Sequence, residues 1–145
     1  SNDGGLAKST DNGATWTDIS NNLSISQQNS IGISSSNSSV MVAGLQDIGS
    51  IYRNSSWQVI GGGDGEDSFI DRTNDNVIII TGTNGSHQRS DSGPSGPFND
   101  IDGLPKGNGN ALFFSPIRQD PANASKYYAG GRANLYVSTN KGEVS

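Results

Sequence analysis

The sequence contains no cysteine, so disulfide bonds cannot contribute to its stability. Small secreted domains of eukaryotes usually depend on such bonds, because a short chain buries little hydrophobic surface. If the protein is extracellular, the absence of cysteine therefore suits a bacterial surface protein, stabilised by packing alone.

Hydrophobic residues are also scarce, at 30% of the 145 positions, which is too few for a thick core covered on both sides. They occur in short runs between turn-forming glycine, serine, asparagine and aspartate, and not in helical stripes. None of these runs is long enough to span a bilayer. We therefore predict an all-β chain of many short strands, with no membrane insertion.

Basic residues are few as well. The net charge is −5, and the chain has no basic face that could hold phosphates, so we do not expect nucleic acid as a partner. The first residues are polar and do not resemble a signal peptide, so we expect the sequence to be an internal piece of a longer protein.

An internal repeat is the strongest feature that is present. The aromatic residues Trp16, Trp57 and Phe98 recur at a constant spacing of 41 residues, and each is followed three positions later by isoleucine. A unit of about 40 residues with four short strands is typical of one blade of a β-propeller. We therefore predict a partial propeller of about three and a half four-stranded antiparallel blades.

The strands of each unit are named A to D in chain order. The predicted units are a half blade (1–23), two blades (24–61 and 62–104) and an incomplete blade (105–145). The predicted strands are C and D at 6–9 and 15–19, then A to D at 30–34, 40–45, 50–54 and 57–60, A to D at 68–71, 77–82, 86–90 and 98–101, and A to C at 112–115, 127–130 and 135–138. Since closed propellers have four to eight blades, either further blades of the same chain or further copies would complete the ring.

The first predicted C–D turn carries a short motif. Residues 9–16 read S-x-D-x-G-x-T-W, in which Gly13 permits a tight turn and Asp11 can accept backbone N–H groups across it. We expect Trp16 to bury its ring between neighbouring blades. The motif residues, with those of two imperfect copies, are Ser9, Asp11, Gly13 and Trp16, then Asp91, Gly93 and Phe98, then Ser138, Asn140 and Gly142.

This motif resembles the Asp box of BNR-repeat propellers. With the phrases at 43–49 and 61–67, the chain is most similar to propellers of exported bacterial proteins, often from Bacteroidetes, with type IX sorting domains. It resembles sortilin-type and xyloglucanase-type propellers more loosely. The resemblance implies a secreted or cell-surface protein. Sialidases share the Asp box and suggest a catalytic role for Asp11 and Asp91, but in such families the box lies at the blade periphery, so we expect both to be structural.

In propellers the D–A and B–C loops crowd one end of the channel, where a ligand would bind. The candidate ligand-binding residues on these loops are Gln46, Asp47, Asp64, Glu66, Asp67, Asn84, Arg132 and Asn134. The acidic residues at 64, 66 and 67 could form a hard-cation site or an acid/base pair, but we expect a solvated acidic loop. Arg132 and Asn134 could contact a sugar or a carboxylate, or form a hydrogen bond between blades. His87, the single histidine, is expected on the surface, and we expect no cofactor and no metal site.

Three functions remain open. The first is a non-catalytic module that recognises a glycan or a protein partner. The second is a fragment of a propeller glycoside hydrolase, similar to a xyloglucanase or a sialidase, in which carboxylates near the channel would act as acid and base on a polysaccharide; no single catalytic residue is identified. The third is a repeat unit that associates with itself through unpaired blade edges.

Overall fold

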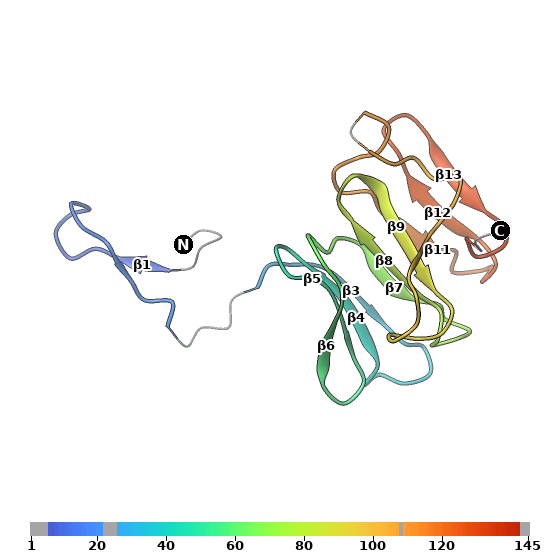
Figure 1. The fold of residues 1–145 in the computed structure, drawn as a ribbon, viewed down its shortest axis with the longest axis horizontal. Coiled ribbons are helices and arrows are strands. Elements are labelled where there is room, and N and C mark those ends of the chain that lie inside the picture. The colour runs from blue at the N-terminus through green and yellow to red at the C-terminus, as the bar shows by residue number, and fades with distance from the viewer. Residues whose placement is uncertain (1–5, 22–25, 108, 143–145) are drawn as a thin grey trace.

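A computed structural model describes residues 6–21, 26–107 and 109–142, and in this part the chain is almost entirely β. Its single helical element is the 3₁₀ turn η1 (Thr83–Gly85), so no helix there is long and apolar enough to cross a membrane. The strands form one hairpin and three larger antiparallel sheets, each built from consecutive strands (Figure 1).

The bounds of the strands follow the chain order. The hairpin contains β1 (Ala7–Lys8) and β2 (Thr17–Asp18), and the next sheet contains β3 (Gln28–Ile33), β4 (Met41–Leu45), β5 (Gly49–Arg53) and β6 (Trp57–Gly61). The following sheet contains β7 (Ser68–Ile70), β8 (Ile78–Gly82), β9 (Ser86–Ser90) and β10 (Asn99–Asp100), and the last contains β11 (Ile117–Gln119), β12 (Tyr127–Gly130) and β13 (Leu135–Ser138).

The strand predictions agree with this architecture except at one strand. The short apolar runs form the predicted strands to within one or two residues, and β9, β12 and β13 match their predicted bounds. The prediction of a strand at 112–115 is wrong, because the first strand of the last sheet is β11, directly after Pro116. Its register is set by the following turn, which places Ile117 opposite Ala129.

The turns between the first two strands of each larger sheet share one construction. The backbone N–H groups of Ser34, Asp71 and Asp120 donate to the carbonyls of Val40, Val77 and Lys126. Inside each turn, the side-chain oxygen of the same serine or aspartate accepts the N–H two residues later, at 2.7–3.0 Å. Short polar side chains favour such turns because they replace missing backbone partners.

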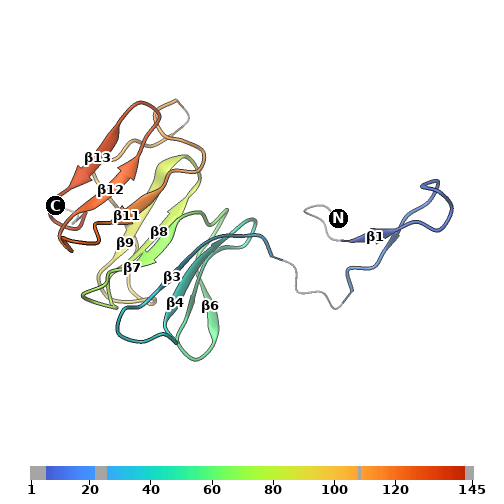
Figure 2. The ribbon, with the colours of Figure 1, turned by 180° about the vertical axis from the view of Figure 1, so that it is seen from behind.

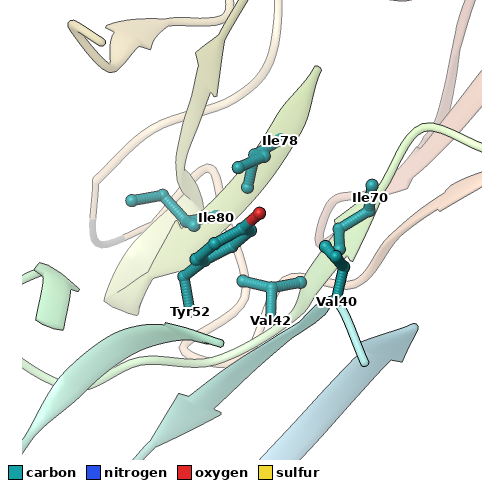
Figure 3. Packing of buried hydrophobic residues seen from close by; sticks show 6 residues of the cluster. All are labelled: Val40, Val42, Tyr52, Ile70, Ile78 and Ile80. Carbon is teal, nitrogen blue, oxygen red and sulfur yellow. The ribbon is translucent and has the colours of Figure 1, made fainter. Parts of the chain in front are cut away.

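The first hydrophobic core lies between the β3–β6 sheet and the β7–β10 sheet. Figure 3 shows Val42 and Tyr52 from one sheet pointing toward Ile70, Ile78 and Ile80 of the other. Alternate residues of a strand point to opposite faces, so each sheet contributes one apolar row to this layer. At this interface the two sheets pack face to face.

A second core lies between the β7–β10 sheet and the β11–β13 sheet. It contains Phe69 and Ile79 on one side and Ile117 and Tyr127 on the other, all buried. The rings of Phe69 and Tyr127 meet edge to face with centroids 5.1 Å apart, a favoured geometry for aromatic pairs. The three sheets thus stack in chain order, with the β7–β10 sheet in the middle (Figures 1 and 2).

The β1–β2 hairpin stands apart from this stack in both views (Figures 1 and 2). Consistent with this position, the Trp16 side chain is 65% exposed, so the prediction that its ring is buried between blades is wrong. The outer face of the β3–β6 sheet is open too, and Ile31, Ile33 and Val59 on it are each more than half exposed.

Candidate functional site

The first C–D turn, between β1 and β2, is held together by its own side chains. The Ser9 hydroxyl accepts the N–H of Gly13 at 2.8 Å, and the Asp11 carboxylate accepts the N–H of Thr15 at 2.9 Å and its hydroxyl at 2.5 Å. Gly13 has a φ of 92°, which glycine adopts without strain. The hydrogen bond from the Thr15 hydroxyl is the main reason that the pKa of Asp11 is lowered to about 2. The Asp11 carboxylate is therefore occupied within its turn.

The other two copies of the motif differ from each other. In the last copy, the Ser138 hydroxyl accepts the N–H of Gly142 at 2.7 Å and donates to Asn140 at 2.7 Å, as Ser9 does in the first turn. In the middle copy, Asp91 forms an ion pair with Arg89 and does not bond across the turn. The serine bonds of the first turn are therefore reproduced at the last copy, and the middle copy is built differently.

The prediction of a solvated acidic loop at 64–67 is wrong. Glu66 and Asp67 are buried, with exposed fractions of 1% and 0%. Glu66 accepts the N–H of Ser115 at 3.3 Å through one carboxylate oxygen, and its other oxygen is buried without a partner among the described residues. Burial raises the pKa of Glu66 to about 7. The Glu66 carboxyl group therefore changes between its neutral and charged forms close to neutral pH.

The two other carboxylates of this loop serve different neighbours. Asp67 accepts the N–H of Ile117 at 2.9 Å and pairs with the guanidinium of Arg118, which ties the loop to the last sheet. Asp64 accepts the N–H of Asp47 at 2.9 Å, which ties the loop to the β4–β5 turn. Within the described ranges, no three side chains of the metal-binding types come together in a possible site.

His87 is fully buried, so its prediction as a surface residue is wrong. It lies on β9, between β8 and β10, and its Nδ1 atom is 3.0 Å from the Thr81 hydroxyl. Its Nε2 atom is buried with no partner in the described part of the chain. Burial lowers the pKa of His87 to about 4, so the ring is neutral at physiological pH.

Several of the candidate residues have a structural role in the backbone of the B–C turns. Asp47 and Asn84 adopt left-handed conformations with φ of 60° and 56°, in the turns after β4 and β8. The backbone N–H of Gln46 donates to Gln27 at 2.9 Å, and that of Asn84 donates to Phe113 at 2.9 Å. Aspartate and asparagine tolerate this conformation better than other non-glycine residues, which accounts for their positions.

One pocket joins a D–A loop to a B–C turn. It has a volume of about 510 Å³ and contains two of the candidate residues, Arg132 and Asn134, while Gln46, Asp47 and Asp64 lie outside it. Its lining residues are Gly103, Leu104, Pro105, Lys106, Gly109, Asn110, Arg132, Ala133, Asn134 and Tyr136. A second pocket of about 480 Å³ adjoins it and shares Gly103, Leu104 and Tyr136.

Local hydrogen bonds position the cationic side chains of the first pocket. Arg132 donates its Nε–H to the Ala111 carbonyl at 3.2 Å and its backbone N–H to the Asn110 carbonyl at 3.4 Å. Lys106 pairs with Asp100 at 2.8 Å, and the hydrogen bond from this lysine is the main cause of the lowered pKa of Asp100.

The sequence analysis overlooked three side chains of this pocket, Lys106, Asn110 and Tyr136. The first two lie in a glycine-rich loop, and Tyr136 lies in a strand. Polar residues at 106 and 110 among glycines were the signal that could have indicated a binding loop.

No protein-family model matches the chain, and no curated protein matches it either. Among solved structures, it is similar to an ancestral GH74 enzyme, with a TM-score of 0.64 and 19% identity over 94% of this chain and 20% of the other. It is also similar to the GH74 enzyme of Niastella koreensis, with a TM-score of 0.59 and 22% identity over 79% of this chain and 17% of the other. The chain thus spans about a fifth of the length of these enzymes. At this identity the likeness shows the fold alone, so the chain is all-β and has the fold of part of a β-propeller.

Proposed function

We propose that the chain is part of a non-catalytic propeller module that binds a glycan in the pocket around Arg132. The observation that carries this proposal is that one pocket joins Arg132 and Asn134 of a B–C turn to Lys106 and Asn110 of a D–A loop. These two loop types are the ones expected to meet at the ligand-binding end of a propeller.

The chemistry of the pocket suits a sugar. Asn110 and Asn134 can each donate and accept hydrogen bonds, as sugar hydroxyl groups require. Tyr136 adds an aromatic ring with a polar end, and the charged groups of Lys106 and Arg132 supply further donors. Binding sites typically combine apolar surface with a few placed polar groups, and this lining has both.

The acidic loop supports a non-catalytic role. A glycosidase needs two carboxyl groups on either side of the scissile bond, about 5 to 9.5 Å apart. Glu66 and Asp67 are neighbours in sequence and buried, and Asp67 is engaged by Ile117 and Arg118. We therefore assign them to holding the loop between the sheets.

We further infer that the C–D turns are Asp-box turns of the BNR type and that the protein is exported to the bacterial surface or medium, as in proteins with type IX sorting domains. The serine and aspartate bonds inside the turn at Ser9, repeated in part at Ser138, support the first inference. The second rests on the sequence resemblance and on the absence of cysteine. Further blades would then belong to the same chain, and a protein could replace the glycan as partner.

A second candidate function is a fragment of a propeller glycoside hydrolase. The observation that favours it is that the two solved structures described above are both GH74 enzymes. Glu66, with its pKa raised to about 7, would be the proton donor in this case.

A glycan array tests the first proposal on the full chain. We expect binding that is lost in Arg132→Ala and Asn134→Ala and kept in Arg53→Ala. Arg53 is a matched control because its guanidinium also donates to a backbone carbonyl, that of Ser39, but lies on a different sheet. Binding that survives in Arg132→Ala and Asn134→Ala would contradict the proposed site. Release of reducing ends from a polysaccharide, abolished in Glu66→Gln, would instead support the hydrolase.

A further inference from the structure

We infer that the pocket around Arg132 recognises a carboxylate-bearing sugar, such as a uronic acid unit of an acidic glycan. The inference rests on the proposed function, because it specifies the ligand of the same pocket. Its starting point is charge. The chain has 14 acidic and 9 basic residues, yet the pocket lining contains two basic side chains and no acidic one. A locally positive pocket attracts anions, even on a protein whose net charge is negative.

Arg132 is held in a position that suits a carboxylate. The bond from its Nε–H to the Ala111 carbonyl fixes one edge of the guanidinium, and the bond from its backbone N–H to Asn110 fixes the base of the side chain. Arg132 lines the pocket, and its terminal N–H groups donate to no other residue in the described part of the chain. Such groups bind a carboxylate through two parallel hydrogen bonds, which lysine cannot do. Because the side chain is already oriented, little conformational entropy remains to be lost on binding.

Lys106 can add a second positive charge to the same ligand. Its partner Asp100 is outside the pocket lining, and the two side chains are 40% and 54% exposed. An ion pair this exposed contributes little free energy, so a ligand carboxylate can compete for the ammonium group. The pocket therefore offers one fixed and one adjustable cation.

The remaining lining favours a sugar over an acidic peptide. Asn110 and Asn134 provide neutral donors and acceptors for ring hydroxyls, and Tyr136 provides an aromatic surface for the face of a sugar ring. At Gly103 and Gly109 there are no atoms within 4 Å of where a Cβ would lie, so a broad ring can approach the backbone there. An acidic peptide would use the cations and leave these features without a role.

The test compares three probes on the full chain by isothermal titration calorimetry. The probes are an oligogalacturonate, a neutral oligosaccharide of the same length, and an oligoglutamate peptide. We expect the oligogalacturonate to bind at least about tenfold more tightly than the neutral oligosaccharide, because only the former offers Arg132 a carboxylate. We expect it also to bind more tightly than the peptide, because only a sugar offers ring hydroxyls to Asn110 and Asn134. We expect added salt to reduce the preference over the neutral oligosaccharide, because the charges of an exposed pocket are screened.

Substitutions in the pocket test whether the oligogalacturonate binds there. Arg132→Ala should weaken oligogalacturonate binding about tenfold or more, Arg132→Lys should restore it only in part, and Arg53→Ala should leave it unchanged. Circular dichroism and thermal unfolding of each variant establish that it is folded. Should Arg132→Ala unfold, Asn134→Ala and Lys106→Ala address the same pocket from two other side chains, and each should weaken binding.

The outcomes separate the two levels of the proposal. If the neutral and acidic oligosaccharides bind equally well, the inference of a carboxylate fails while the glycan-binding function stands. If the peptide binds as tightly as the oligogalacturonate, the inference of a sugar fails. If no oligosaccharide on the array or in solution binds, the proposed function fails with it.

Discussion

Glu66 and His87 are two buried side chains whose charged forms are both disfavoured by burial. For Glu66 the folded pKa is about 7 and the reference value is 4.5, so its contribution to stability is present below pH 4.5 and lost as the pH rises through 7. For His87 the folded pKa is about 4 and the reference value is 6.5, so its contribution is present above pH 6.5 and lost as the pH falls through 4. The two slopes oppose each other over nearly the same range.

The first prediction follows from this cancellation. Between about pH 4.5 and pH 6.5, the free energy of unfolding of the unaltered chain should change little, because the two contributions offset each other. In Glu66→Gln the contribution of His87 is no longer offset. The free energy of unfolding should therefore fall on acidification, by an amount on the order of 2 kcal/mol between these pH values. Urea unfolding at several pH values, followed by circular dichroism, measures this slope.

His87→Gln is the matched variant with the opposite sign. Its stability should rise on acidification, because Glu66 then gains its proton in the folded state before the unfolded state does. Slopes of the same sign in the two variants would contradict the assignment of both side chains as buried. The acidic groups with lowered pKa values, such as Asp11 and Asp71, are common to all three proteins and do not affect the comparison.

Gly65 shows how closely the acidic loop approaches the neighbouring turn. A Cβ added there would lie 2.1 Å from the carbonyl oxygen of Gly49, a contact that requires the backbone to move. We therefore predict that Gly65→Ala lowers the free energy of unfolding by about 1–3 kcal/mol or more. Gly62→Ala, in the same loop, has no atom within 4 Å of the added Cβ and should be nearly neutral. A similar loss in both variants would mean that the backbone conformation of the loop, and not the close contact at Gly65, sets the effect.

At the scale of elements, the repeated A–B turn links each sheet to the next. Asp71 accepts hydrogen bonds from Thr73 in its own turn at 2.8 Å and 2.6 Å, and from Gln119 and Tyr127 of the next sheet at 2.8 Å and 2.7 Å. Burial alone would raise the pKa of Asp71, but the hydrogen bonds from Thr73 and Tyr127 outweigh it and lower this pKa. The carboxylate therefore connects two sheets in its charged form.

Removing this carboxylate should separate the turn from its neighbours. We predict that Asp71→Ala costs about 2–4 kcal/mol of stability, because the buried Tyr127 hydroxyl loses its acceptor and the half-buried Gln119 loses its link to this turn. The equivalent Asp120 is bonded by its own turn and by Tyr128, so Asp120→Ala should have a much smaller effect. Thermal unfolding of both variants at neutral pH measures the difference. Equal losses would mean that the turn, and not the link between sheets, is what Asp71 stabilises.

The elements differ in how far the sequence could predict them. The strands and the turn at Ser9–Trp16 were predictable because their signals are local: short apolar runs, a glycine and short polar side chains. The strand at 112–115 was predicted wrongly because its three apolar residues are a stronger local signal than β11, in which Ile117 is followed by two polar residues. Only the pairing with β12 distinguishes the two, and pairing is not a local property.

A local signal in the A–B turns was available but overlooked. In each of the three larger sheets, a serine or aspartate is followed three residues later by asparagine, at Asn37, Asn74 and Asn123, and each asparagine accepts the N–H two residues on. Burial of Glu66 and His87, by contrast, could not be predicted from local sequence. It depends on residues that are distant in the chain: Glu66, for example, is bonded by Ser115, which lies 49 positions further on, just before the next sheet.

At the scale of the whole molecule, the three sheets repeat one packing scheme that is incomplete on the outer face of the β3–β6 sheet. Ile33 and Ile70 occupy equivalent positions, each directly before the serine or aspartate of its A–B turn. Ile70 is 5% exposed because the β3–β6 sheet covers it, whereas Ile33 is 52% exposed. The equivalence makes the two isoleucines a matched pair for measuring what a neighbouring sheet contributes.

We predict that Ile70→Ala lowers the free energy of unfolding by about 2–4 kcal/mol and that Ile33→Ala lowers it by less than about 1 kcal/mol. The difference arises because only Ile70 leaves a cavity between two packed sheets. Ile33→Thr, which keeps a β-branched side chain, separates strand propensity from burial at the exposed position. Urea unfolding should be repeated over a range of protein concentrations. If Ile33→Ala costs as much as Ile70→Ala, the outer face is covered in solution. A cost that grows with protein concentration would identify the cover as a second copy of the chain, because association stabilises by mass action.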